Sequence, residues 1–259
     1  MHGHLVLEHL LHRDRLIVAI GTATVAALAW AYLASGAGMD TDMMADMPDM
    51  APMPWTPLYA ALLFVMWWVM MIAMMAPSAA PTVLLYATVK RKQQSAPRAA
   101  IDAWTFLAGY LVTWAGFSVV AVLAQWALER LGLLSMAMAS TSAFLGGGIL
   151  VAAGLYQFTP LKRACLRYCE SPLLFLTRHW RPGTSGAFGM GLRHGSYCVG
   201  CCWFLMALLF VSGVMNLLWI IGIALYVAGE KLLPFGRRLS QAAGVILILS
   251  GTIVLARAW

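Results

Sequence analysis

Residues 196–229 limit the fold more than any other feature, because these 34 residues contain no Asp, Glu, Lys or Arg before Glu230. One helix of that length would measure about 51 Å at about 1.5 Å per residue. The hydrocarbon core of a bilayer is only about 30 Å thick. Ser212 and Gly213 are typical turn residues near the middle of the run. We therefore expect two membrane-spanning helices joined by a tight turn.

The rest of the chain also has the composition of a membrane protein. Of its 259 residues, 62% are apolar and 10% are charged, whereas soluble domains are about half apolar and about a quarter charged. This excludes a water-soluble enzyme with an ordinary surface, and also a disordered chain. We predict an all-α polytopic membrane helix bundle, formed as a single domain over residues 16–259. Its seven expected spans are residues 16–35, 58–76, 103–128, 143–158, 196–211, 215–229 and 241–256.

The distribution of positive charge predicts the orientation of these spans. With a cytoplasmic N-terminus, fifteen of the seventeen Lys and Arg residues lie on the cytoplasmic side, as the positive-inside rule requires. Residues 1–15 and a loop at 160–195 are then cytoplasmic, a loop at 36–56 is external, and the C-terminus is outside. The first apolar run is too long for a signal-peptide core, so we expect an uncleaved anchor. We predict a bacterial inner-membrane protein in contact with the lipid bilayer, with no nucleic-acid partner.

Five cysteines form the strongest chemical signal. Residues three or four apart on a helix share a face, so each group of cysteines can point in one direction, and His194 falls on the face of Cys198. Thiolates suit Cu(I), Zn²⁺ or an iron–sulfur cluster. We predict that both groups converge on one metal site with sulfurs within about 4 Å of one another. The groups are Cys165 and Cys169 in the loop, and Cys198 with at least one of Cys201 and Cys202 at the start of the next span.

Two further roles for the cysteines stay open. Free cysteines are among the most buried residue types and can simply pack in a core. The nearby cations Arg167 and Arg193 would also favour thiolates, so the cysteines could instead form a reactive pair.

Methionines form a second signal in the external loop. Thioethers are soft ligands that bind Cu(I) and ignore hard ions, and the loop interleaves methionines with aspartates. The prolines in the loop prevent a stable helix, so the spacing is not that of a packed helical face. A flexible polar loop without a ligand is the alternative. The predicted ligands are Met43, Met44, Met47, Met50 and Met53.

The second span continues this pattern. Met66, Met70 and Met74 lie on one helical face, and Met71 and Met75 lie on the next. Pro77 and Pro81 are expected to kink or end this helix. Methionines at helical spacing are commonly packing residues. We nevertheless include the stripe formed by 66, 70 and 74 as metal ligands, because it continues from the thioether loop toward the thiolates.

Other polar residues give weaker signals. His2, His4, His9 and His12 crowd the N-terminus, where we favour a solvated tail over metal binding. Glu230 and Lys231 are adjacent at a cytoplasmic helix end, where an internal pair would account for both. No Walker, Rossmann or nucleophile-elbow motif is present, so we favour a protein that is not an enzyme.

The motifs MMIAMMAPSAAP, CLRYCESPLLFL and RHGSYCVGCCW resemble a family of bacterial predicted metal-binding integral membrane proteins of unknown function. The likeness extends from the second span to about Lys231. The resemblance implies metal binding, and it implies no established reaction.

The sequence therefore supports one leading hypothesis and two alternatives. The leading hypothesis is capture or relay of Cu(I), with delivery to a membrane or periplasmic cuproprotein partner; zinc or another soft metal is the alternative cargo. The second hypothesis is a membrane thiol–disulfide redox protein. The third is an accessory subunit of a membrane complex with a structural metal.

Overall fold

The computed structural model describes residues 2–36, 55–93, 99–135 and 138–258, with the side chains of these ranges described from Leu16 onward except that of Gln93. In these ranges the secondary structure is helical, apart from one isolated bridge between Leu134 and Ser140. The expected all-α fold is confirmed. The helices are α1 (His2–Ala34), α3 (Pro57–Gln93), α4 (Ala99–Arg130), α5 (Ala143–Tyr156), α6 (Pro160–Glu170), α7 (Pro172–His179), α8 (Gly183–Ala207), α9 (Leu209–Ser212), α10 (Leu217–Leu232) and α11 (Gly236–Arg257).

Among the described residues, five helical segments are long and apolar enough to cross a membrane. Together α5 and α6 form a sixth candidate, a broken span bent by 67°, and α10 has only 16 residues. This bundle is compatible with a multi-pass membrane protein, whereas the count of seven spans and their orientation stay predictions. The five segments are Leu16–Ala34, Pro57–Lys92, Ala99–Arg130, Gly183–Ser212 and Gly236–Arg257.

The long uncharged stretch is broken where the sequence predicts a turn. Short helix α9 ends at Ser212, and Gly213 adopts a φ of 97°, a conformation that glycine adopts without steric cost. Asn216 then caps α10 by accepting a hydrogen bond from the Trp219 amide at 3.2 Å. The long uncharged stretch is therefore broken at the predicted turn, whereas its second half as a separate membrane span stays a prediction.

The segment 160–195, expected as a loop, is mostly helical. It contains α6, α7 and the first half of α8. Helix α6 buries Cys165 and Leu166 and exposes Arg163 and Arg167, so its cysteines face the bundle and its arginines face outward. Lys162 is the exception, because it is buried on the inner face. Because these arginines interrupt the apolar sequence, a search for continuous apolar runs does not detect this amphipathic helix.

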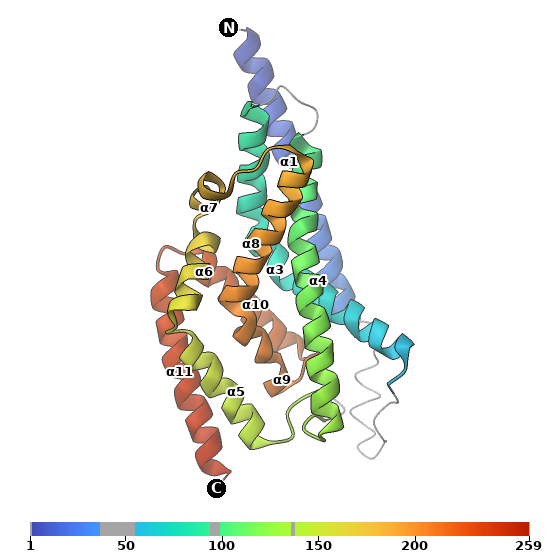
Figure 1. Ribbon diagram of the computed structural model, residues 1–259, viewed down its shortest axis with the longest axis vertical. Helices are drawn as coiled ribbons and strands as arrows, with labels where there is room; N and C mark the ends of the chain where they lie inside the picture. Colours follow the sequence, from blue (N-terminus) through green and yellow to red (C-terminus); the bar gives the residue numbers. More distant parts are fainter. Residues whose placement is uncertain (1, 37–54, 94–98, 136–137, 259) are drawn as a thin grey trace.

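Helix α3 runs through Pro77 and Pro81 without ending. Each proline lacks the amide hydrogen that would bond the carbonyl four residues earlier, which favours a bend. Figure 1 shows α3 changing direction between its first and second halves. The bend lies next to Met75 and Ser78, two residues that contribute to the site described below.

Glycines allow α8 to pack closely on α4. A Cβ atom at Gly191 would clash with the Phe106 carbonyl oxygen, and one at Gly109 would clash with the Phe188 carbonyl oxygen. Helices α5 and α11 pack side by side at one edge of the bundle in the same way, through Gly147 and Gly251 (Figure 1). Small residues at these crossings let the helix backbones approach. The α4–α8 contact places the cysteines of α8 in the core.

Candidate metal centre

Four cysteines from α6 and α8 meet in the core, and we call Cys169, Cys198, Cys201 and Cys202 the thiol cluster. The Sγ atoms of Cys169 and Cys201 lie 3.9 Å apart. Cys198 joins the group through its carbonyl oxygen, which is contacted by the thiols of Cys201 and Cys202. All four are buried and carry free thiols. Two helices thus bring soft donor atoms together.

The separation of the sulfurs fits a shared metal. Two thiolates bound to one metal ion at about 2.3 Å lie at most about 4.6 Å apart, and the Cys169–Cys201 distance satisfies this limit. The thiols of Cys201 and Cys202 donate hydrogen bonds to the Cys198 carbonyl oxygen at 3.1 and 2.9 Å. Within the described ranges no group of three or more His, Cys, Asp or Glu side chains has the arrangement of a metal site. Metal binding would therefore require these thiols to turn away from the backbone.

Cys165 lies at the edge of this arrangement. Its sulfur packs on Gly200 of α8, where an added Cβ would lie 2.8 Å from Sγ. The sulfur–sulfur hydrogen bond found in the described part of the chain joins Cys169 and Cys201 and does not include Cys165. The assignment of Cys165 and of the thiol cluster as metal ligands stays a prediction.

A cationic group that the sequence pattern did not connect with the cysteines contacts Cys198. The Lys231 ammonium donates hydrogen bonds to Cys198 Sγ at 2.9 Å and to Ser78 Oγ at 3.2 Å. It also lies 3.8 Å from the Met75 thioether sulfur. The Tyr110 hydroxyl lies 3.1 Å from Cys198 Sγ and donates to the Met75 carbonyl oxygen at 3.2 Å. Polar groups from α3, α4 and α10 therefore surround Cys198 of α8.

Glu230 and Lys231 do not form the expected internal pair. Glu230 pairs with Lys162 of α6, whose Nζ lies 2.7 and 2.9 Å from the two carboxylate oxygens. Lys162 also donates to the Cys201 carbonyl oxygen at 3.1 Å. Consecutive residues on a helix point about 100° apart, so Glu230 faces α6 while Lys231 faces α3 and α8.

His194 lies one helical turn before Cys198, as predicted, and is 3% exposed. Its ring packs against Phe106, Tyr110 and Phe175, with ring centroids 4.9 to 6.0 Å away. Its Nδ1 atom is buried and has no hydrogen-bond partner among the described residues. Because unpaired buried polar atoms are costly, this nitrogen is a reasonable candidate for a ligand-binding role.

The methionine stripe of α3 is part of the core. Met66, Met70 and Met74 are each at most 2% exposed, which is compatible both with packing and with metal binding. The thioether next to Lys231, which itself contacts Cys198, belongs instead to Met75. Met75 lies on the adjacent face of the helix. Met43, Met44, Met47, Met50 and Met53, together with the side chains of the N-terminal histidines, lie outside the described part of the molecule.

Comparison with known families points to copper. Residues 64–254 match the family model PpoB2, described as a copper chaperone. The chain belongs to this copper chaperone family. The matched residues include α4 to α10 and all five cysteines, so the family gives the thiol cluster a copper-related context. The expected metal-binding family is thereby confirmed, with copper as its metal. Searches of curated proteins and of solved structures find no match.

Proposed function

We propose that the protein is an integral membrane copper chaperone that binds Cu(I) at the thiol cluster and delivers it to a cuproprotein. The observation that carries this proposal is the contact between the Cys169 and Cys201 sulfurs, 3.9 Å apart on two different helices. Membership of the copper chaperone family supports the choice of metal.

The donor atoms favour a soft metal ion. Thiolates and thioethers select Cu(I) over hard ions such as Mg²⁺ and Ca²⁺, and the site contains thiols together with the Met75 thioether. His194 Nδ1 offers an imidazole nitrogen without another partner among the described residues. These donors allow Cu(I) to exchange ligands within the site without entering water.

Charge balance favours a monovalent ion. Two thiolates and one Cu(I) carry a net charge of −1, and the buried Lys231 ammonium beside Cys198 adds +1. The sum is zero, which limits the cost of holding charge at a buried site. A divalent ion on the same two thiolates would leave the buried site with a positive charge.

The methionines supply a route to the thiol cluster in this proposal. The external loop with Met43, Met44, Met47, Met50 and Met53 precedes α3, and Met66, Met70 and Met74 follow along its buried face. Thioethers are neutral ligands and hold Cu(I) less strongly than thiolates, so copper would move toward the stronger donors. Delivery to a membrane or periplasmic cuproprotein completes the proposed function, in the inner membrane of a bacterium.

The test is Cu(I) binding by the purified protein in detergent, measured without oxygen by competition with a coloured Cu(I) chelator. We expect the double variant Cys169→Ser/Cys201→Ser to lose the tightest site, because it removes the two facing sulfurs. Cys165→Ser is the matched control, because it removes a buried thiol at the edge of the cluster. Circular dichroism checks that both variants retain the helical fold. Equal tight binding by the double variant and the wild type would contradict the proposed site.

A further inference from the structure

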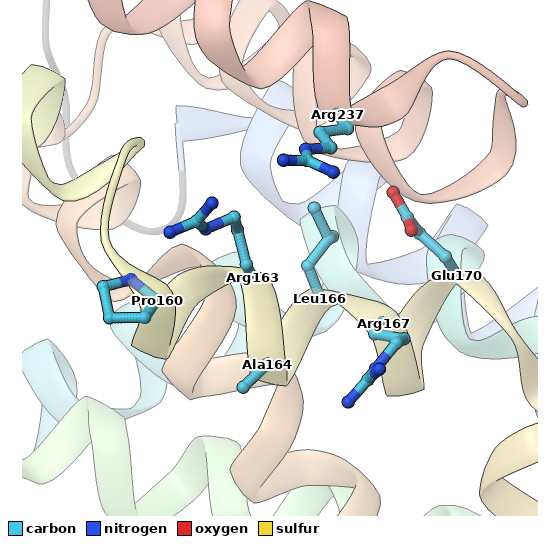
Figure 2. A pocket seen from close by; sticks show the side chains of 7 residues that line it. All are labelled: Pro160, Arg163, Ala164, Leu166, Arg167, Glu170 and Arg237. Carbon is cyan, nitrogen blue, oxygen red and sulfur yellow. The ribbon is translucent and has the colours of Figure 1, made fainter.

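A second site lies on the outward face of α6, where α6 approaches the start of α11. A pocket of about 460 Å³ opens there. Figure 2 shows the side chains of Arg163 and Arg237 extending into it from the two helices, with Leu166 between them. The pocket is lined by Pro160, Arg163, Ala164, Leu166, Arg167, Glu170 and Arg237.

The pocket carries an excess of positive charge. Arg163, Arg167 and Arg237 contribute three guanidinium groups, and Glu170 contributes the one carboxylate of the lining. All three arginines are exposed, and none forms an ion pair with another described residue. Guanidinium groups bind phosphate through two parallel hydrogen bonds. The arginines of the pocket can therefore bind the phosphate group of a separate ligand.

The start of α11 adds to this preference for an anion. Phe235 precedes the helix and provides no side-chain cap for its first turn. The amides of Gly236, Arg238 and Leu239 bond the Leu233 and Phe235 carbonyl oxygens, so the contribution of this turn is the positive end of the helix dipole. Arg237 extends from the same turn, so the dipole and the guanidinium group favour an anion in the same region.

Beyond its first turn, the helix that carries Arg237 is apolar and exposed. On α11, Val245, Ile246 and Leu249 are 49%, 62% and 56% exposed. Most of the apolar part of α11 lies outside the core. A ligand with a phosphate head and long apolar tails could place the head among the arginines and its tails along α11. Free phosphate would use the arginines alone.

We propose that this pocket binds the phosphate headgroup of an anionic phospholipid. Basic pockets between membrane helices are known to take such headgroups. The site lies on the opposite face of α6 from Cys169, whose side chain is buried. It is therefore separate from the proposed copper site, and its test does not depend on copper binding.

The experiment is native mass spectrometry of the purified full chain titrated with defined ligands. Phosphatidylglycerol and phosphatidylcholine with identical acyl chains separate headgroup charge from tail binding, and inorganic phosphate separates the lipid from the free anion. We expect phosphatidylglycerol to bind at least about tenfold more tightly than phosphatidylcholine, because only the former carries a net negative charge. We expect inorganic phosphate at the same concentration not to displace it.

Matched variants locate the binding. Arg163→Gln/Arg237→Gln should weaken phosphatidylglycerol binding by about tenfold, because it removes the two facing guanidinium groups. Arg178→Gln/Arg238→Gln changes the net charge equally at exposed positions outside the pocket and should leave binding within about twofold of the wild type. Equal losses in both double variants would overturn the proposed location. Equal binding of the two lipids by the wild type, or displacement by inorganic phosphate, would overturn the lipid assignment even if a variant fails to fold.

Discussion

Two buried lysines lie near the thiol cluster and meet different partners. Lys162 of α6 is fully buried and forms a short ion pair with the Glu230 carboxylate. Lys231 of α10 is 4% exposed and contacts the Cys198 sulfur, the Ser78 hydroxyl and the Met75 thioether. One lysine has a fixed carboxylate as its counterion, whereas the other has only groups that can be neutral.

This difference separates a structural pair from a group suited to a metal site. The Glu230 carboxylate is a hard anion with no soft donor character, and Lys162 can neutralise it permanently. The Cys198 sulfur beside Lys231 can be a thiol or a thiolate and can also bind Cu(I). Adjacent residues of α10 thus support the fold on one side and the proposed chemistry on the other.

Breaking the structural pair should have the largest effect. Glu230→Gln leaves the Lys162 charge buried without a counterion, which should lower the free energy of unfolding by about 3–5 kcal/mol. Chemical denaturation in detergent, followed by circular dichroism, measures this loss. The double variant Lys162→Met/Glu230→Met is the control, because it buries no charge and should recover most of the stability. A single variant as stable as the wild type would contradict the structural role of the pair.

Changing Lys231 should cost less stability and more copper affinity. Lys231→Met removes two hydrogen bonds, but Cys198 can become a neutral thiol, so we expect a loss of about 1–2 kcal/mol. Cu(I) affinity should fall about tenfold, as is common when a group next to a metal ligand is removed. The chelator competition assay measures it at a temperature where the folded state persists. Unchanged copper affinity would remove Lys231 from the proposed charge balance.

The smallest effect should separate two buried methionines. Met75→Leu and Met71→Leu nearly conserve volume, so each should change stability by less than about 1.5 kcal/mol. Only Met75 has its sulfur beside Lys231 among the described methionines, so we expect Cu(I) affinity to fall for Met75→Leu alone, and by less than for Lys231→Met. Parallel titrations of both variants provide the comparison. Equal affinities would show that the Met75 thioether serves packing only.

The helices were predictable where continuous apolar sequence defines them. Hydropathy located most of the bundle, and the turn at Gly213 followed from the excessive length of residues 196–229. Helices α6 and α7 do not form continuous apolar runs, because their exposed faces carry arginines. The spacing of Cys165 and Cys169 indicated a short helical segment, but its extent could not be read from hydrophobicity along the sequence, which does not measure hydrophobicity around a helix.

The site was predictable only within single helices. Spacing placed Cys198 and Cys202 on one face, but it could not show that Cys169 would reach Cys201 while Cys165 packs on Gly200. Those contacts depend on how α6 lies across α8. The positions of Lys231 and Met75 depend likewise on the packing of α10 and on the bend of α3, which local sequence does not specify.

Burial of the thiol cluster also determines how quickly copper could leave it. Cys198, Cys201 and Cys202 are each at most 2% exposed, so a water-soluble chelator cannot touch their sulfurs while the surrounding helices stay packed. Removal by such a chelator would then wait for the helices to separate, and its rate would level off as the chelator concentration rises. A partner protein that inserts its own ligands between α6 and α8 would not face this delay. The lifetime of bound copper would therefore depend on encounters with the partner and hardly at all on the surrounding solution.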